Sequence, residues 1–318
     1  MEHWTAYWQA TTSLNSFAEG EAAKGYQGEV AHFWQMQLAD LPTDALIADL
    51  GTGNGALALL LAEQRLLQQK DWRILALDAA AIRPQQNLAL KQRYAELAAA
   101  IRFYPQIAME QLPFARQSMD LLVSQFALEY SKLELSLAEA VRVLKPGGRL
   151  IAIMHSGETN LAKDSALALS VMAALKAGNG ILDRIQQLLQ LVTDLYARRQ
   201  LPEHNVEFLQ ANRQLLAQVK QYQQQLSAAE SDWFQYLFAP FATLLFQPKA
   251  ENSQQFLLLR QQLDYYRQRL ADQQAACITP QRQQLIDRLL QQQGWQTSWR
   301  ELRVEGQLFG LILISFAE

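Results

Sequence analysis

The sequence is poor in cysteine and in long apolar runs. Cys277 is the single cysteine among 318 residues, so no disulfide can form within the chain. No uncharged apolar stretch reaches the ~20 residues that a membrane-spanning helix needs, so we expect no membrane association. The N-terminal residues MEHWTAYWQATT lack the basic segment and the continuous apolar segment of a signal peptide. These absences together predict a soluble, cytoplasmic protein.

An excess of positive charge is absent as well. The chain has 28 Lys and Arg residues against 31 Asp and Glu residues, a net charge of -3 and a pI near 5.9. Nucleic-acid-binding proteins need a basic patch or stripe, and the sequence has none, so we expect no nucleic-acid partner. Hydrophobic residues are abundant at 50%, enough for the core of one large domain or two ordinary ones.

Short apolar runs alternate with helical patterns from residue 46 to residue 154. This alternation is typical of consecutive βαβ units and predicts a parallel sheet with helices on both faces. Residues 145–148, KPGG, are expected to stop the third helix and to turn the chain into the fifth strand. The expected strands are 46–50, 73–78, 101–104, 119–125 and 149–154, and the expected helices are 56–69, a segment from Pro84, and 133–144.

A long glutamine-rich region follows the fifth strand. It shows helical periodicity for more than a hundred residues, most clearly at 208–226 and 256–274, and no strand pattern interrupts it. Residues 232–248, DWFQYLFAPFATLLFQP, are densely apolar and aromatic, which fits either a packed hairpin or the wall of a pocket. This region therefore predicts a helical insertion.

Sheet character returns at the end of the chain. Thr279 followed by Pro280 is a good helix start, and Gly294 is a plausible stop. The residues after Gly294 read as two strands around a turn at Glu305 and Gly306. A chain that leaves a sheet, builds helices and then completes the sheet contains an inserted subdomain.

The turn after the first strand reads DLGTGNG and indicates which ligand the sheet binds. Gly51, Gly53 and Ala56 fit a dinucleotide fingerprint, but Asp49 stands two residues before the first glycine. Beside a diphosphate that acid would be repelled by roughly 2.5 to 4 kcal/mol at an effective dielectric near 20. A cationic ligand such as S-adenosylmethionine would instead be attracted by Asp49. Asp78, at the end of the second strand, suits the ribose hydroxyls of either ligand.

With these residues in place, the run from 46 to 154 resembles a class I S-adenosylmethionine-dependent methyltransferase. Four motifs carry the resemblance in the usual order over about a third of the chain: IADLGTGNG, ILALDAA, MEQLPFARQSMDLLVSQFALEY and EAVRVLKPGGRLIAIM. The resemblance implies a Rossmann-like, doubly wound, mostly parallel seven-stranded sheet whose last strand is antiparallel. It also implies S-adenosylmethionine as cofactor, and no metal is expected.

The resemblance implies roles for the residues of the first two motifs. Asp49 would bind the amino group of the methionine part of the donor, and Gly51 and Gly53 would let the backbone pass close to it. Asp78 would take the ribose hydroxyls, with Ala79 against the adenine.

Further donor contacts are implied in the third motif. Relatives often have an acid for the adenine amino group at the position of Ala108, so the backbone of Met109 is the expected substitute here. Ser124, Gln125 and Phe126 would line the methyl-donor pocket.

Acceptor-side residues are less well defined. His155 ends the fifth strand at the edge where ligands bind, so it is either a general base or a polar residue that leaves the strand into solvent. Glu129 and Tyr130 could face the acceptor. The aromatic N-terminal region, with Tyr7, Tyr26 and Trp34, would form a flap over the donor or pack on the sheet edge; these are the two interpretations that remain open for these three residues.

We therefore expect an enzyme that methylates an oxygen or nitrogen atom of a small-molecule acceptor. The expected domains are a helical flap at 1–45, a donor-binding domain at 46–156 with 279–318, and a helical lid at 157–278. The apolar stretch 233–246 would suit a small, partly hydrophobic acceptor, or would belong to the core of the insertion.

Two alternatives remain open. The first is an interaction module whose glutamine-rich helices pair two copies into a homodimer or bind a partner protein. The second is a nicotinamide-dependent oxidoreductase, which Asp49 and the last two strands disfavour.

Overall fold

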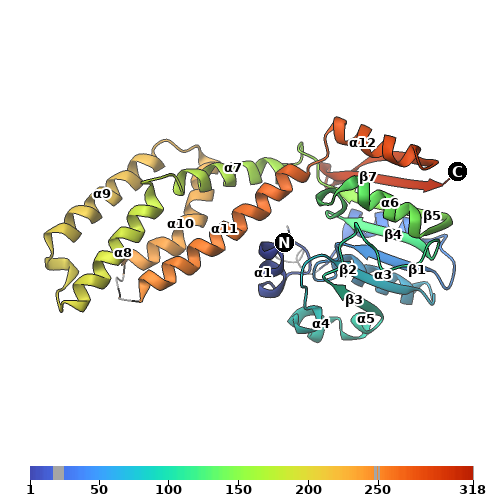
Figure 1. The fold of residues 1–318 in the computed structure, drawn as a ribbon, viewed down its shortest axis with the longest axis horizontal. Helices are drawn as coiled ribbons and strands as arrows, with labels where there is room; N and C mark the ends of the chain where they lie inside the picture. The colour runs from blue at the N-terminus through green and yellow to red at the C-terminus, as the bar shows by residue number, and fades with distance from the viewer. Residues whose placement is uncertain (17–24, 247–248, 250, 318) are drawn as a thin grey trace. The chain divides into compact units, whose positions relative to one another are not determined.

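The chain divides into two compact units. The computed structural model describes residues 1–16, 25–246, 249 and 251–317, apart from the side chains of residues 89 and 93. One unit, the sheet domain, comprises Met1–Ala162 and Asp272–Glu318, and the other, the helical domain, comprises Lys163–Ala271 (Figure 1). The insertion expected at 157–278 thus corresponds to a helical domain that begins and ends a few residues further inside.

The sheet domain contains a seven-stranded sheet in the order β3-β2-β1-β4-β5-β7-β6. Strand β7 runs antiparallel to both of its neighbours, β5 and β6, whereas strands β1 to β5 pair with one another in parallel. The predicted Rossmann-like topology with an antiparallel last strand is confirmed. The strands are β1 (Leu46–Leu50), β2 (Arg73–Asp78), β3 (Ile101–Pro105), β4 (Met119–Gln125), β5 (Leu144–Met154), β6 (Trp295–Val304) and β7 (Gln307–Ala317).

Helices cover both faces of this sheet because successive strand residues point to opposite sides. Ile47 belongs to a core shared with α2 and α3, while its neighbour Ala48 belongs to a core shared with α6 and α12. Continuous apolar strands are therefore buried on both faces. The helices are α1 (Glu2–Ala10), α2 (Gly28–Leu38), α3 (Ala56–Leu67), η2 (Pro84–Gln86), α4 (Leu88–Arg93), α5 (Ala95–Ala99), η3 (Leu128–Tyr130), α6 (Leu133–Val143) and α12 (Pro280–Gln291).

The expected role of the KPGG segment was wrong. Helix α6 already ends at Val143, and β5 begins at Leu144, which pairs with Met119 of β4. The segment therefore lies inside the strand, where the register between β4 and β5 shifts. Gly147 has a φ of 79°, so this irregularity needs a glycine.

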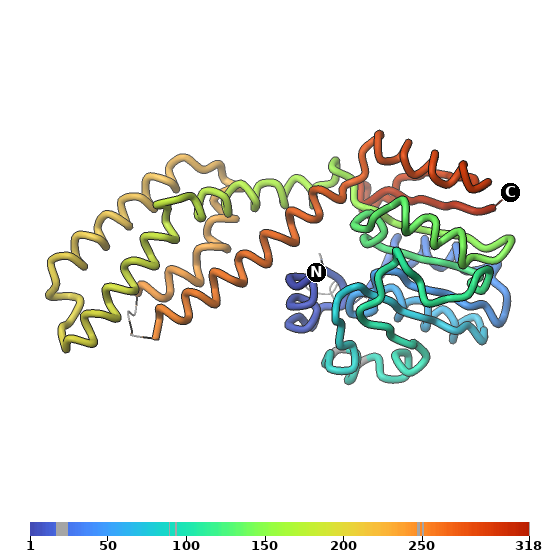
Figure 2. The backbone as a smooth tube through the Cα atoms, viewed as in Figure 1, coloured from blue at the N-terminus to red at the C-terminus, as the bar shows by residue number. Residues whose placement is uncertain are grey.

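The helical domain has a hydrophobic core of its own. Figure 2 shows the chain leaving β5 through α7 and returning through α11 to α12. Residues 228–246 form one continuous helix despite Pro240, so of the two interpretations left open for residues 232–248 the packed hairpin was wrong. Gln247 and Pro248 lie outside the described residues. The helices are α7 (Asn160–Leu175), α8 (Ile181–Ala197), η4 (Pro202–His204), α9 (Val206–Gln223), α10 (Ala228–Phe246) and α11 (Asn252–Ala276).

Core packing explains why α10 stays helical. Phe234, Leu237, Phe241 and Leu244 recur at helical spacing, and all four are buried in the core of the helical domain. Within the described part of the chain, no helix is long and apolar enough to cross a membrane. The same part of the chain holds no group of three or more His, Cys, Asp and Glu side chains suited to a metal ion.

Candidate functional site

The candidate site lies at the carboxyl edge of the sheet, where the strand order reverses between β1 and β4. The N–H groups of Gly51 and Thr52 donate to the carbonyl of Leu77 at 2.8 and 2.9 Å. Asp78, which follows Leu77, accepts from the N–H of Gly53 and from the N–H of Ala80, both at 2.8 Å. The end of β2 thus holds the glycine turn after β1 in place.

Both glycines of this turn are required by close packing. Gly51 and Gly53 have φ angles of 75° and 55°. A Cβ atom on Gly51 would lie 2.2 Å from the Cβ of Ala127, and one on Gly53 would lie 2.5 Å from Cζ2 of Trp8. The loop after β4 and the indole of Trp8 therefore contact the glycine turn, which is predicted to bind the methyl donor.

Asp49 is a buried acid beneath this turn. It is 1% exposed, and its Oδ2 atom has no hydrogen-bond partner among the described residues. Burial raises its pKa to about 7, and the nearby charge of Asp78 adds to the rise. Burial also raises the pKa of Asp78 to about 6, against the opposing effect of its two N–H donors. An unpaired carboxylate oxygen at this depth is the kind of group that a cationic ligand satisfies.

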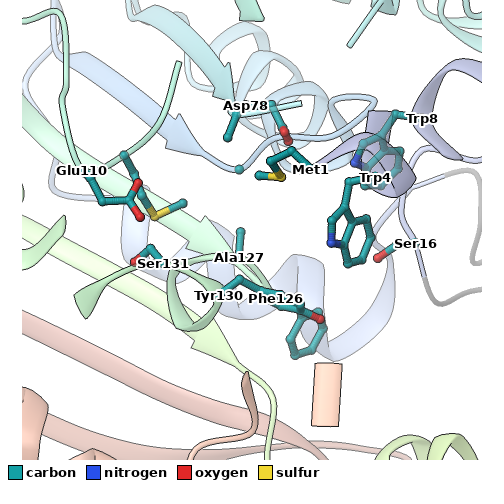
Figure 3. A pocket seen from close by; sticks show the side chains of 13 residues that line it. Met1, Trp4, Trp8, Ser16, Asp78, Glu110, Phe126, Ala127, Tyr130 and Ser131 are labelled. Carbon is teal, nitrogen blue, oxygen red and sulfur yellow. The ribbon is translucent and has the colours of Figure 1, made fainter. Parts of the chain in front are cut away.

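A small cavity of about 130 Å³ opens beside Asp78 (Figure 3). Of the predicted donor-binding residues, five line it: Gly51, Asp78, Ala79, Met109 and Phe126. The structure adds lining residues that the sequence analysis did not assign to the donor: Met1, Trp4, Trp8, Ser16, Glu110, Ala127, Tyr130 and Ser131.

A large cavity of about 660 Å³ adjoins the small one. Gln125, predicted to contact the donor, lines this large cavity and not the small one, and so does Tyr26. Burial, and secondarily the charge of Asp49, raises the pKa of Tyr26 well above its usual value, so its hydroxyl stays neutral. The residues common to both cavities are Trp8, Ser16, Gly51 and Phe126.

Helix α1 brings its aromatic residues to the small cavity through contacts with distant parts of the chain. His3 Nε2 lies 2.6 Å from Asp272 Oδ2, and the Trp4 indole N–H donates to the same oxygen at 3.0 Å. Gln9 donates to the carbonyl of Ala81 at 2.6 Å. These contacts explain how Trp4 and Trp8 come to stand opposite Glu110 across the cavity (Figure 3).

The other predicted aromatic residues lie elsewhere. The hydroxyl of Tyr7 faces the carbonyls of Asn15 and Ser16, and its ring lines neither cavity. Trp34 is fully buried in the core and donates its indole N–H to Gln125 Oε1 at 2.6 Å. Trp34 therefore acts on the site through Gln125.

Four predicted donor contacts, Asp49, Gly53, Ala108 and Ser124, line neither cavity. Ser124 is fully buried, donates to the carbonyl of Leu50 at 2.9 Å and accepts from the N–H of Leu128 at 3.0 Å. Ala108 is exposed, but Glu110, two residues further on, lines the small cavity. Sequence reasoning missed Glu110 because the acid is displaced by two positions from where relatives place it.

His155 lies behind Phe126. The two rings stack with centroids 4.3 Å apart and an interplanar angle of 12°, and His155 lines neither cavity. Its backbone N–H donates to Glu129 Oε1 at 2.7 Å. Burial lowers the pKa of His155 to about 3 and raises that of Glu129 to about 8, so both side chains are mainly neutral at pH 7. The geometry gives the predicted base no direct path to either cavity.

Similarity to known families follows the sheet. The family described as Methyltransferase domain matches residues 48–152. An uncharacterized methyltransferase of Bacillus subtilis, YodH, is 44% identical over 63 residues, which are 20% of this chain. The chain spans only 27% of the length of that curated relative.

Solved structures with partial similarity carry the same kind of description. A putative S-adenosyl-L-methionine-dependent methyltransferase of Methanococcus maripaludis is 26% identical, with 42% of this chain and 58% of that chain covered and a TM-score of 0.33. The geranyl diphosphate C-methyltransferase of Streptomyces coelicolor is 18% identical, with 49% and 64% covered and a TM-score of 0.36. These TM-scores are low. The similarity to methyltransferases therefore lies in the matched domain family, the sequence motifs and the order of the strands.

Proposed function

The sheet domain of this chain belongs to the class I S-adenosylmethionine-dependent methyltransferase superfamily, and from this premise we propose that the protein methylates a small-molecule acceptor on oxygen or nitrogen. S-adenosylmethionine is the cofactor of this superfamily and supplies the methyl group from its sulfonium. The observation that carries the proposal is Asp49, a buried acid with an unpaired oxygen beneath the glycine turn. It fits an ammonium group and opposes a diphosphate.

The residues around the small cavity fit the donor. Asp49 would hold the amino group, and the turn at Gly51 and Gly53 would let the methionine part approach the backbone. Asp78 has lone pairs left for ribose hydroxyls after accepting two N–H groups, and Ala79 and the backbone of Met109 would contact the adenine. Glu110 lines the small cavity, and we propose that it accepts from the adenine amino group, as the acid at the position of Ala108 does in relatives.

The donor needs more room than the small cavity offers. Small-molecule sites are usually about 300–1,000 Å³, and the cavity beside Asp78 is about 130 Å³. Trp4 and Trp8 of α1 occupy its rim, and α1 is attached mainly by side-chain contacts such as those of His3 and Gln9. We therefore propose that α1 is the mobile part of the predicted N-terminal flap.

The acceptor would lie in the large cavity. Phe126 and Gly51 line both cavities, so an acceptor atom can approach the donor methyl there without crossing bulk water. Trp8, Phe126 and Phe309 give this cavity aromatic walls, and methyl transfer depends mainly on holding the acceptor close to the methyl group. With His155 behind Phe126, proximity and desolvation are the main contributions that these residues make.

The helical domain is proposed to act as a lid. Its support is the chain path: the insertion leaves and rejoins the sheet domain at the carboxyl edge, where Ser156 and Ile278 form a backbone bridge. The alternative is a docking surface for a second copy or another protein. A docking surface would expose leucines such as Leu215 and Leu259 in the single chain. Leu215 is buried there and Leu259 is half-buried, so these two leucines do not support a docking surface.

Calorimetry with three ligands tests the proposed function. S-adenosylmethionine and S-adenosylhomocysteine should bind, and NAD should not, because only the first two place an ammonium group near Asp49. Tight binding of NAD, with no heat of binding for the other two ligands, would exclude the proposed methyltransferase function.

A further inference from the structure

Gln125 presents a hydrogen-bond donor in a known direction. Its side chain ends β4, is 7% exposed, and accepts the indole N–H of Trp34 through Oε1 at 2.6 Å. An indole N–H can only donate, so the amide must turn its oxygen toward Trp34. The Nε2 group is left without a partner among the described residues.

This amide has no simple way to relax. Trp34 is fully buried among core residues, so it holds Oε1 where it is. A buried N–H group without an acceptor is unfavourable, and such groups in folded proteins usually meet a ligand or water. Gln125 lines the large cavity, so an oxygen atom of a molecule bound there can supply the missing acceptor.

The charge of the large cavity is one-sided. Its described lining residues include Glu29 and Glu305 but no Lys, Arg or His. Glu29 accepts from the backbone N–H of Glu305 at 3.2 Å, which holds the Glu29 carboxylate beside the backbone of Glu305. Hydrogen bonds from its own N–H and from that of Glu305 lower the pKa of Glu29, so it remains charged. A carboxylate or phosphate entering here meets two negative charges and, among the described lining residues, no positive one.

The backbone offers no substitute for a positive side chain. Two helix N-termini reach the large cavity, those of α2 and α7, and free N–H groups there could attract an anion. Glu29 already places its carboxylate in the first turn of α2. Thr159 Oγ1 accepts from the N–H of Ala162 at 3.2 Å and so caps α7. Both helix ends are therefore occupied by this chain's own side chains.

Aromatic walls favour a flat or cationic occupant. Trp8, Phe126 and Phe309 line the large cavity, and the last two meet edge to face with centroids 5.1 Å apart. Aromatic faces attract cations as well as other rings.

We infer that the acceptor of this enzyme is an uncharged or cationic molecule with an oxygen that receives a hydrogen bond from Gln125, and that anionic acceptors are rejected. This inference rests on the proposed function, because it names the substrate class of the same site. Glu29 and Glu305 set the charge preference, and Gln125 selects the oxygen.

Three phenols that differ in one side-chain charge test the charge preference. Tyramine is cationic, 4-ethylphenol is neutral and 3-(4-hydroxyphenyl)propanoate is anionic, and each offers a ring with one hydroxyl oxygen. Their binding to the full chain saturated with S-adenosylhomocysteine is measured by calorimetry at low salt. We expect the anion to bind about tenfold more weakly than the cation, and added salt to narrow the gap.

Matched variants separate the two contributions. The double variant Glu29→Gln, Glu305→Gln should bring the three affinities together, whereas Glu63→Gln, an exposed change on α3, should leave the order intact. Gln125→Met should weaken all three phenols about three- to tenfold without changing their order or the affinity for S-adenosylhomocysteine. Gln125→Leu also removes the donor without adding a charge and serves if the Met variant folds poorly.

The outcomes distinguish this inference from the function beneath it. If S-adenosylhomocysteine does not bind the folded protein, the proposed function fails. If it binds, but the anion binds as tightly as the cation or none of the three phenols binds, the inference on acceptor class is overturned while the methyltransferase assignment stands.

Discussion

Asp49 is only partly ionised at neutral pH, because burial raises its pKa to about 7. Only the ionised form attracts the ammonium group of the donor, so affinity should rise as the pH increases from 5.5 to about 7.5 and then level off. Binding near pH 6.5 should release protons. Calorimetry in two buffers of different ionisation enthalpy measures this release.

Asp49→Asn is the matched change for that experiment, since it keeps the shape and removes the titration. Most of the pH dependence should disappear with it, leaving the smaller part due to Asp78, whose pKa is about 6. Asp71→Asn, an exposed change after α3, is the control. An unchanged pH profile in Asp49→Asn would remove Asp49 from the donor site.

Asp78 links donor binding to stability. Asp78→Ala removes the acceptor of the Gly53 and Ala80 N–H groups as well as the predicted ribose contact. Each lost hydrogen bond to a charged group is worth about 1.5–3 kcal/mol, so the donor should bind at least tenfold more weakly and the midpoint of thermal unfolding should fall. Normal donor affinity in a folded Asp78→Ala variant would contradict the placement of the ribose.

His155 makes stability depend on pH in the acid range. Its folded pKa of about 3 lies below the unfolded value near 6.5, so the unfolded chain gains a proton first as the pH falls. This contribution to stability is complete above pH 6.5 and is lost progressively below it. His155→Phe, which can keep the stack on Phe126, should therefore lose less stability than wild type between pH 6.5 and 4.5 in urea unfolding.

The same position tests the base hypothesis once an acceptor is known. A general base predicts that His155→Ala loses roughly two to four orders of magnitude in turnover while still binding donor. Retained turnover would leave His155 as the support of Phe126, which is the role that the ring stack indicates.

Helix α1 is the element that must respond to the donor. Its aromatic residues line a cavity too small for S-adenosylmethionine, and Trp8 rests on Gly53. Donor binding should change amide hydrogen exchange in residues 2–10 and leave the interior of α3 unchanged, because α3 is buried in the core. Equal exchange of α1 with and without donor would contradict the mobile flap.

Much of the sheet could be predicted because its signals are local. The strands at 46–50 and 73–78 are short apolar runs, and Thr279 caps α12 through the N–H of Arg282 as its position indicates. The errors arise where distant contacts decide. The pairing of Leu144 with Met119 starts β5 early, and core packing keeps residues 228–246 in one helix.

The site was predictable to the same extent. The places of Asp49 and Asp78 in the chain follow from the spacing of the glycine turn: Asp49 lies in β1 just before the turn and Asp78 ends β2, and their contacts with the donor stay predictions. The contact of Trp8 with Gly53 and the pairing of His3 with Asp272 join residues far apart in sequence, and periodicity carries no information on them. The sequence contains only a weak indication of Glu110, because this acid lies in the expected loop but two positions after Ala108.

The molecule as a whole contains separate cores, and the helical domain has one to itself. If it is a lid, donor plus acceptor should slow hydrogen exchange in α10 and its neighbours, and changing Trp233 or Phe238 should alter acceptor affinity but not donor affinity. Both side chains are half-buried against that core, and Gln235→Ala, an exposed change on α10, is the control.

Light scattering completes this comparison. A monomer at all concentrations, with a helical domain protected by ligand, supports the lid. A tight dimer in which ligand leaves the hydrogen exchange of the helical domain unchanged would favour the docking surface instead.

The backbone bridge between Ser156 and Ile278 has a consequence for the length of the insertion. The N–H of Ile278 donates to the carbonyl of His155 at 2.7 Å, so the insertion begins and ends at adjacent points of the sheet domain. Lengthening a loop between two fixed points is inexpensive, about 0.6 kcal/mol for each doubling. A helical segment of another length can therefore join these two points at small cost, without displacing the strands that carry the glycine turn.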